Sequence, residues 1–232
     1  MHEKNVMNRR EFCTAAAAGL VAMGALASPA TGQAREAAGR VHRADPALIR
    51  KVLDGMESTI GRYWSVPRKD GEFLSLMVKA TRATRVLEVG TSQGYSAIWM
   101  GLGLEETGGR LTTIEIDPGR HALAQKNVRE AGLAGRIALV RGDAHKELAG
   151  LRGPFDFVFL DADKDRLMDY FRQLYPAKLA PGGIIAVHNA VSEAGDLKEY
   201  TDTIRRHPEF DTVVVSATMD DGICLSYRHR RG

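Results

Sequence analysis

Cysteine is scarce in this sequence of 232 residues, which contains only Cys13 and Cys224. Two cysteines without metal-type spacing exclude a disulfide-rich scaffold and a zinc knuckle. Positive charge is not concentrated either, because 32 Lys and Arg residues are interspersed with 29 Asp and Glu residues. A dedicated nucleic-acid binder would show a basic stripe, so we expect no nucleic-acid partner. With 44% hydrophobic and 26% charged residues, the composition is that of an ordinary globular protein.

The N-terminal residues differ in character from the rest of the chain. Arg9 and Arg10 precede an uninterrupted run of small and apolar residues, Thr14–Ala27. This run is shorter than the ~20 apolar residues that a membrane-spanning helix needs, but it has the length of a signal-peptide core. Together with the paired arginines, it resembles a twin-arginine export signal.

Two small-residue motifs, ending at Ala27 and Ala34, are candidate cleavage sites. We therefore expect residues 1–34 to be a signal peptide, and the mature protein to be exported to the periplasm without stable membrane insertion. The alternatives are an alanine-rich N-terminal helix, or an extension upstream of a true start at Met7. Either alternative would make the protein cytoplasmic.

Strand-like and helical patterns alternate along the remaining chain, which indicates a mostly parallel sheet with helices on both faces. The expected strands are Arg85–Val89, Leu111–Ile116, Arg136–Val140, Phe155–Leu160, Gly183–Val187, Thr212–Ser216 and Ile223–Tyr227. The expected helices are Pro46–Trp64, Asp70–Thr81, Gly94–Leu104, Pro118–Ala131, His145–Leu148, Arg166–Leu179 and Glu193–Arg206. We therefore predict an α/β, Rossmann-like, doubly wound sheet of seven strands. The last two strands lack an intervening helix and should form an antiparallel hairpin. Residues 35–81 are expected to form an N-terminal helical cap on a ligand-binding domain of residues 82–232.

A glycine-rich turn follows the first strand. Gly90 and Gly94 would let a ligand approach the backbone at the start of a helix, but Ser92 replaces the second glycine of the dinucleotide fingerprint. The second strand closes with Glu115, which is about the right distance along the chain to accept both ribose hydroxyls. Glu88 lies within the turn, where a carboxylate would repel a pyrophosphate but attract an ammonium group. These features predict a nucleoside site.

Polar residues also follow the fourth and fifth strands. Asp161 and Lys164 follow one strand, and His188 and Asn189 follow the other. Because the carboxyl ends of parallel strands surround the ligand crevice, these side chains should share one site. Asp161, His188 and Asn189 could ligate one divalent metal. Asp163 and Asp165 are interpreted as solvated residues or helix caps.

Taken together, these motifs resemble the cation-dependent O-methyltransferases, which include the catechol and caffeoyl-CoA enzymes. The resemblance rests on Glu88–Ser96, Glu115, Gly142-Asp143-Ala144, Asp161–Lys164 and Pro181-Gly182-Gly183, and it covers about Val66 to Arg228. It implies S-adenosylmethionine as the cofactor, held by Val66, Glu88, Gly90, Thr91, Tyr95, Ser96, Glu115, Asp143, Ala144 and Asp161. It also implies metal ligands at Asp161, His188 and Asn189, and catalytic roles for Asp161, His188 and Lys164, with Lys164 as general base. The implied acceptor is a small hydroxylated, catechol-like molecule.

One position departs from the family pattern, because His188 stands where the family usually has Asp. Mg²⁺ prefers oxygen ligands, so imidazole favours Mn²⁺, Fe²⁺, Ni²⁺ or Zn²⁺ over Mg²⁺. Alternatively, the site is metal-free and His188 is the base, since its unperturbed pKa of about 6.5 suits neutral pH. A third alternative is ligand binding without catalysis.

The remaining candidates are weaker. His145 could border the adenine, whereas His121, His207 and His229 are interpreted as surface residues. For Tyr63 and Trp64, packing is favoured over a role in an acceptor pocket. A homodimer is left open. The rival functions are an NAD-dependent oxidoreductase, which Glu88 and Ser92 disfavour, and an exported, non-catalytic nucleoside-binding protein.

Overall fold

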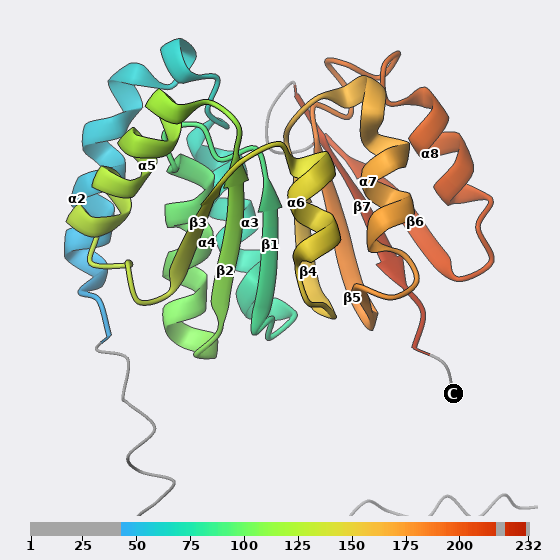
Figure 1. Ribbon diagram of the computed structural model, residues 1–232, viewed down its shortest axis with the longest axis horizontal. Coiled ribbons are helices and arrows are strands. Elements are labelled where there is room, and N and C mark those ends of the chain that lie inside the picture. Colours follow the sequence, from blue (N-terminus) through green and yellow to red (C-terminus); the bar gives the residue numbers. More distant parts are fainter. Residues whose placement is uncertain (1–42, 217–220, 231–232) are drawn as a thin grey trace, which may run out of the picture. The chain divides into compact units, whose positions relative to one another are not determined.

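A single seven-stranded sheet organises the part of the chain that the computed structural model describes, residues 43–216 and 221–230 (Figure 1). Its strands are β1 (Arg85–Val89), β2 (Arg110–Glu115), β3 (Ile137–Arg141), β4 (Phe155–Leu160), β5 (Leu179–His188), β6 (Phe210–Val215) and β7 (Ile223–Arg228). They lie in the order β3-β2-β1-β4-β5-β7-β6. The first five strands are parallel, and β7 is antiparallel to both β5 and β6. The predicted doubly wound sheet with a C-terminal hairpin is thus confirmed. The predicted signal peptide and its cleavage sites lie outside the described residues.

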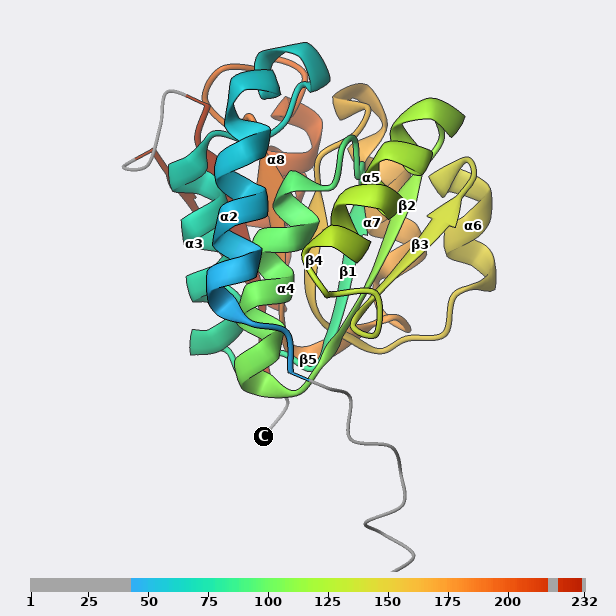
Figure 2. The same cartoon turned by 90° about the vertical axis from the view of Figure 1, so that its left-hand side faces the viewer.

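Helices cover both faces of the sheet (Figures 1 and 2). One face carries α2 (Pro46–Met56), α3 (Arg68–Ala80), α4 (Tyr95–Thr107) and α5 (Pro118–Glu130), and the other carries α6 (Ala144–Gly150), α7 (Leu167–Leu174) and α8 (Lys198–Arg205). Among the described residues, no helix has the length and apolar content needed to cross a membrane.

The two helical layers exist because successive strand residues point to opposite faces. In β1, Val86 joins the core beneath α2 to α5, whereas Leu87 and Val89 join the core beneath α6 to α8. Ile49 and Leu53 of α2 are fully buried in the first of these cores. The N-terminal helices are therefore packed against the sheet-covering helix α4 as part of the same core.

A buried ion pair anchors the start of α2. Arg136 pairs with Glu105 near the end of α4, and both side chains are only 8% exposed. The other carboxylate oxygen of Glu105 accepts the backbone N–H of Ala44 at 3.0 Å, and Arg43 donates to the Glu105 carbonyl at 2.9 Å. Because α4 runs opposite to the strands, this anchor lies at the amino-terminal edge of the sheet.

Three predicted helices are shorter than expected. The first ends at Met56 and continues as 3₁₀ turns at Glu57–Thr59 and Gly61–Tyr63. There the Thr59 hydroxyl donates to the Met56 carbonyl, a bond that competes with helix continuation. Helix α7 ends at Leu174 because Pro176 disfavours the helical conformation of the residue before it. Helix α8 begins at Lys198, since residues 190–197 form turns instead.

Candidate active site

A cavity of about 570 Å³ lies at the carboxyl ends of the parallel strands. The residues predicted to bind the cofactor that line it are Gly90, Glu115, Asp143, Ala144 and Asp161. Its other lining residues are Trp64, Val89, Ile114, Ile116, Arg120, Gly142, His145, Ala162, Asp163, Arg166 and Tyr170. We call this space the cofactor cavity. Its position matches the ligand crevice expected for an open parallel sheet.

The glycine-rich turn brings β1 close to the end of β4. Gly90 has a φ of +93°, and a Cβ there would lie 2.1 Å from the Asp161 carbonyl oxygen, so only glycine fits. Ser92 also adopts a left-handed conformation, with a φ of 49°. Its backbone N–H donates to the Glu115 carboxylate at 2.7 Å. The acid at the end of β2 therefore holds the turn in place.

Glu115 is 6% exposed and has its carboxylate fixed from two sides. One oxygen accepts from Ser92 and the other from the backbone N–H of Asp117 at 2.9 Å. The next residue, Ile116, is 69% exposed beside it in the cofactor cavity. An apolar side chain next to the predicted ribose acid offers a surface for a flat base. The sequence motifs do not single out Ile116 as a binding residue. The signal that could have identified it is its position directly after Glu115.

Glu88 lies beneath the turn and does not line the cofactor cavity. It is fully buried, and its two oxygens accept from the hydroxyls of Ser96 and Thr113, each at 2.5 Å. Burial raises the pKa of Glu88 to about 8, although these two hydrogen bonds oppose the shift. Val66, Thr91, Tyr95 and Ser96 are buried too and are likewise not among the lining residues. Their predicted contact with the cofactor stays a prediction.

A second cavity, of about 420 Å³, lies beside the first. It is lined by Trp64, Ser65, Asp161, Ala162, Lys164, His188, Asn189, Glu193 and Asp221. We call it the acceptor cavity. It brings together all of the residues predicted to act in catalysis or metal binding. Trp64, Asp161 and Ala162 line both cavities.

Asp161 is the centre of a charged cluster at this boundary. Its Oδ1 lies 2.8 Å from Lys164 Nζ and 3.3 Å from His188 Nδ1. Burial alone would raise the pKa of Asp161, but the charges and hydrogen bonds of Lys164 and His188 outweigh it and hold the pKa well below its usual value. Asp161 is therefore ionised and compensated by positive charge.

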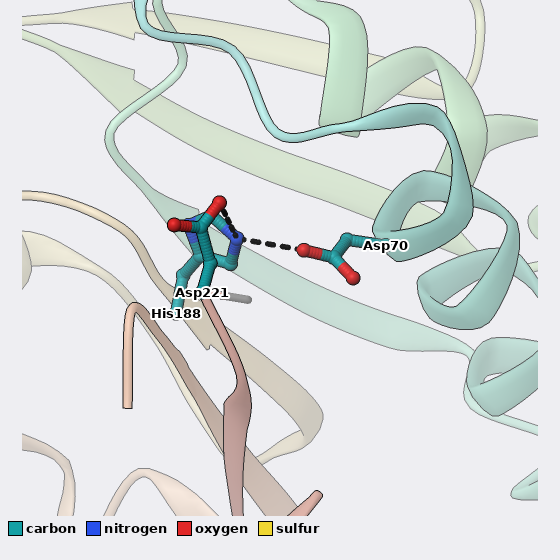
Figure 3. A group of neighbouring side chains, drawn as sticks. All are labelled: Asp70, His188 and Asp221. Atoms are coloured by element: carbon teal, nitrogen blue, oxygen red, sulfur yellow. Dashed lines mark hydrogen bonds and ion pairs between the residues drawn. The ribbon is translucent and has the colours of Figure 1, made fainter. Parts of the chain in front are cut away.

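His188 bridges Asp161 to two further carboxylates. Its Nε2 lies 2.9 Å from an oxygen of the fully buried Asp70 and 4.0 Å from an oxygen of Asp221 (Figure 3). Burial lowers the pKa of His188, but hydrogen bonds to Asp161 and Asp70 prevail and raise it to about 9. At neutral pH the imidazole is then mostly protonated, which makes it a poor proton acceptor.

The donor atoms around His188 suit a divalent cation. One atom each of Asp70, His188 and Asp221 lie within 4.8 Å of one another. Of the predicted ligands, Asp161 faces the other ring nitrogen, and the Asn189 amide donates to the Ser192 hydroxyl at 3.3 Å. Carboxylates with one imidazole fit Mn²⁺, Fe²⁺, Ni²⁺ or Zn²⁺ better than Mg²⁺.

One prediction for a residue beside the cavities, the packing of Trp64, is wrong. Trp64 is not packed but 76% exposed, because its backbone is left-handed with a φ of 50° and its ring points out of the core. Asp163 is solvated, which is one of the two alternatives predicted for it: its side chain is 40% exposed and makes no helix-capping hydrogen bond. Its carboxylate accepts from the Tyr170 hydroxyl and lies 3.0 Å from His145 Nε2. His145 stacks on Tyr170 with ring centroids 4.4 Å apart, and both line the cofactor cavity.

The surface interpretation of the remaining histidines holds only in part. His207 is half-buried against Tyr175 and Phe210, with ring centroids 4.9 and 5.1 Å away. It belongs to an aromatic cluster between α7 and β6 that the helical pattern did not reveal. His121 is half-buried as well, and its Nε2 is buried without a hydrogen-bond partner. His229 pairs with Asp211 at 3.1 Å, and its side chain is 42% exposed.

Comparison with known proteins agrees with this arrangement. The profile of a family described as O-methyltransferase matches residues 44–228. A catechol O-methyltransferase of Mycobacterium tuberculosis is 38% identical over 160 residues, which cover 68% of this chain and 71% of that protein. A catechol O-methyltransferase of Niastella koreensis is 39% identical over 140 residues. The matched residues cover 58% of this chain and 62% of the Niastella protein, which is less than two thirds of its length.

Solved structures show the same fold with ligand bound. The crystal structure of a Bacillus cereus O-methyltransferase in complex with S-adenosylhomocysteine aligns with a TM-score of 0.70 and 26% identity, covering 86% of this chain and 97% of that one. Neither rival function predicted from the sequence finds support in these matches. The chain belongs to the family of S-adenosylmethionine-dependent O-methyltransferases.

Proposed function

We propose that this protein transfers the methyl group of S-adenosylmethionine to a hydroxyl oxygen of a small, catechol-like acceptor. The observation that carries the proposal is the position of Asp161. It lines both cavities and holds Lys164 at 2.8 Å, so that the cofactor and acceptor sites meet at one charged group. The names of the two catechol-methylating relatives support this choice of acceptor.

The residues where the two cavities meet would act mainly by positioning the acceptor and by stabilising charge. In-line displacement at a sulfonium methyl needs the acceptor oxygen held on the axis of the carbon–sulfur bond. Protonated His188 places positive charge beside that oxygen, which favours its anionic form. We assign proton acceptance to Lys164 in its neutral form, so that the ammonium produced by the transfer is paired with Asp161. His188 is disfavoured as the base because both of its ring nitrogens face carboxylates and its pKa is raised to about 9.

A divalent metal ion is a further part of the proposal. Asp70, His188 and Asp221 would hold it, with Asp161 and Asn189 nearby in the acceptor cavity. When bound, such an ion supplies an electrophile that favours the acceptor oxyanion at neutral pH. His188 must lose a proton before it can ligate, so its raised pKa opposes metal binding at low pH. The metal-free alternative keeps His188 protonated as a fixed cation.

Export is a separate proposal, which rests on the sequence alone. Arg9, Arg10 and the apolar run Thr14–Ala27 support a twin-arginine signal, which would carry the folded protein to the periplasm. Residues 1–34 would then be absent from the mature protein.

The test of the catalytic proposal is a methylation assay with S-adenosylmethionine and catechol, followed by product analysis. We expect Lys164→Met to lower kcat by about 10²–10⁴-fold, with little change in the affinity for S-adenosylhomocysteine. Lys126→Met, on the exposed surface of α5 and not among the lining residues of either cavity, is the matched control and should keep full activity. Full activity of Lys164→Met would refute the assignment of the base, and failure of the native protein to methylate any vicinal diol would refute the acceptor class.

A further inference from the structure

A third cavity lies at the edge of the sheet opposite the cofactor and acceptor cavities. It has a volume of about 410 Å³ and lies where β1, β2 and β4 begin. Three arginines line it, Arg85, Arg110 and Arg152, and none of the described residues that line it is acidic. We call it the arginine cavity. It shares no lining residue with the cofactor cavity or the acceptor cavity, so it is a separate site.

Strand pairing brings two of the arginines side by side. Arg85 and Arg110 are the first residues of β1 and β2, and they are partners in the register of this parallel pair. Partner residues on neighbouring strands lie roughly 4.8 Å apart and point to the same face of the sheet. That face is the one that α6 covers, since Leu87, two residues after Arg85, belongs to the core beneath α6 to α8 (Figure 1). The two positive charges therefore share one side of the arginine cavity.

Arg152 adds a third guanidinium group from the loop between α6 and β4. Its carbonyl accepts from the Arg85 guanidinium at 2.5 Å, and the guanidinium carbon of Arg85 lies 5.9 Å from the centroid of the Phe155 ring. These contacts orient Arg85 but do not neutralise its charge. The side chains of Arg110 and Arg152 make no hydrogen bond or ion pair with any residue in the described ranges. They are thus available to a ligand.

Asp156 follows Phe155 in β4, but it does not pair with any of the three arginine side chains. Its Oδ2 accepts from the backbone N–H groups of Thr84 and Arg85 at 2.8 and 2.9 Å, and from the Thr84 hydroxyl at 2.9 Å. This carboxylate therefore fixes the backbone at the start of β1. Three positive charges around one space repel one another, so an anion that enters the arginine cavity relieves this repulsion.

We propose that the arginine cavity binds a small anion that carries two or more phosphoryl groups. A planar guanidinium can donate two parallel hydrogen bonds to phosphate oxygens, and several phosphoryl groups are needed to engage three arginines at once. The volume of about 410 Å³ is within the range of small-molecule pockets, roughly 300–1,000 Å³. A nucleic-acid backbone is disfavoured, because the positive charges of the chain are interspersed with negative ones. This inference does not rest on the proposed function.

Calorimetric titration with tripolyphosphate tests the proposal. The protein is first saturated with S-adenosylhomocysteine, which keeps the anion out of the cofactor cavity. We expect saturable binding, with affinity increasing from phosphate to pyrophosphate to tripolyphosphate. Arg110→Gln and Arg152→Gln should each raise the dissociation constant about three- to tenfold, since solvent exposure weakens these charge-assisted hydrogen bonds. Arg50→Gln, on the exposed side of α2, removes the same charge elsewhere and should leave the constant unchanged.

ADP distinguishes the two sources of such an anion. Tighter binding of ADP than of pyrophosphate would identify a nucleotide, and equal or weaker binding would identify an inorganic oligophosphate. An equal loss of affinity in Arg50→Gln and Arg110→Gln would reveal only general attraction to a basic protein and overturn the proposal. The absence of saturable binding would also overturn it, as would tighter binding of a single-stranded oligonucleotide at the same phosphate concentration. Failure of S-adenosylhomocysteine to bind would contradict the proposed function alone, because the Arg110 and Arg152 variants still locate the anion.

Discussion

Replacing Glu88 with glutamine should make the protein more resistant to alkaline conditions. Glu88 is fully buried beneath the glycine-rich turn, and burial raises its pKa from 4.5 to about 8. The unfolded chain therefore releases this proton well below pH 8, whereas the folded protein keeps it. Glutamine has the same shape and no charge, and it can still hydrogen-bond to Ser96 and Thr113.

The sign and size of the effect follow from proton linkage. Between pH 4.5 and 8 the folded state binds one more proton than the unfolded state, so Glu88 lowers the free energy of unfolding as pH rises. The slope is about 1.4 kcal/mol per pH unit, and it vanishes above pH 8. From pH 6 to pH 9, the native protein should lose about 3 kcal/mol that Glu88→Gln does not lose.

Urea unfolding of the ligand-free protein at pH 6, 7, 8 and 9 measures this difference. His188 also has a raised pKa, and its stabilising contribution is lost between pH 6.5 and about 9. That loss is common to the native protein and the variant, so it cancels in the comparison. Glu130→Gln, on the exposed end of α5, should follow the native curve. Parallel curves for the native protein and Glu88→Gln would show that Glu88 is already ionised in the folded state and refute the reasoning.

Three further outcomes are expected. Glu115→Ala should raise the dissociation constant for S-adenosylhomocysteine about tenfold or more, and an unchanged constant by calorimetry would remove the ribose assignment. The affinity for Mn²⁺ or Zn²⁺ should increase with pH up to about 9, because His188 must lose its proton before it can bind the metal. His188→Asp should shift the metal preference toward Mg²⁺. Elemental analysis that finds no metal at pH 9 would contradict the metal site. Changing Arg9 and Arg10 to lysine should retain the precursor in the cytoplasm, and normal export on cell fractionation would reject the twin-arginine interpretation.

The architecture could be predicted from the sequence because it depends on local periodicity and on where strands end. Alternating apolar strands and amphipathic helices specify a parallel sheet, and the residues after each strand then have to meet at one edge. This reasoning predicts that Asp161, Lys164 and His188 share one site. In the structure, Lys164 Nζ and His188 Nδ1 lie 2.8 and 3.3 Å from Asp161 Oδ1.

The electrostatic partners of His188 could not be predicted in the same way. Asp70 lies 118 residues away in the sequence, on a helix of the N-terminal layer, and Asp221 precedes β7. Only the packing of α3 over the end of β5 brings Asp70 to the imidazole. The outward position of Trp64 was missed for a related reason, since a left-handed backbone at a residue other than glycine leaves no signal in the hydrophobic pattern.

The anchor formed by Arg43, Ala44, Glu105 and Arg136 fixes where any preceding chain is attached. It holds the start of the folded unit at the amino-terminal edge of the sheet, opposite the strand ends that carry the cofactor and acceptor cavities. Among the described residues, the attachment of the preceding chain and the binding of cofactor and acceptor thus lie at opposite edges of the sheet.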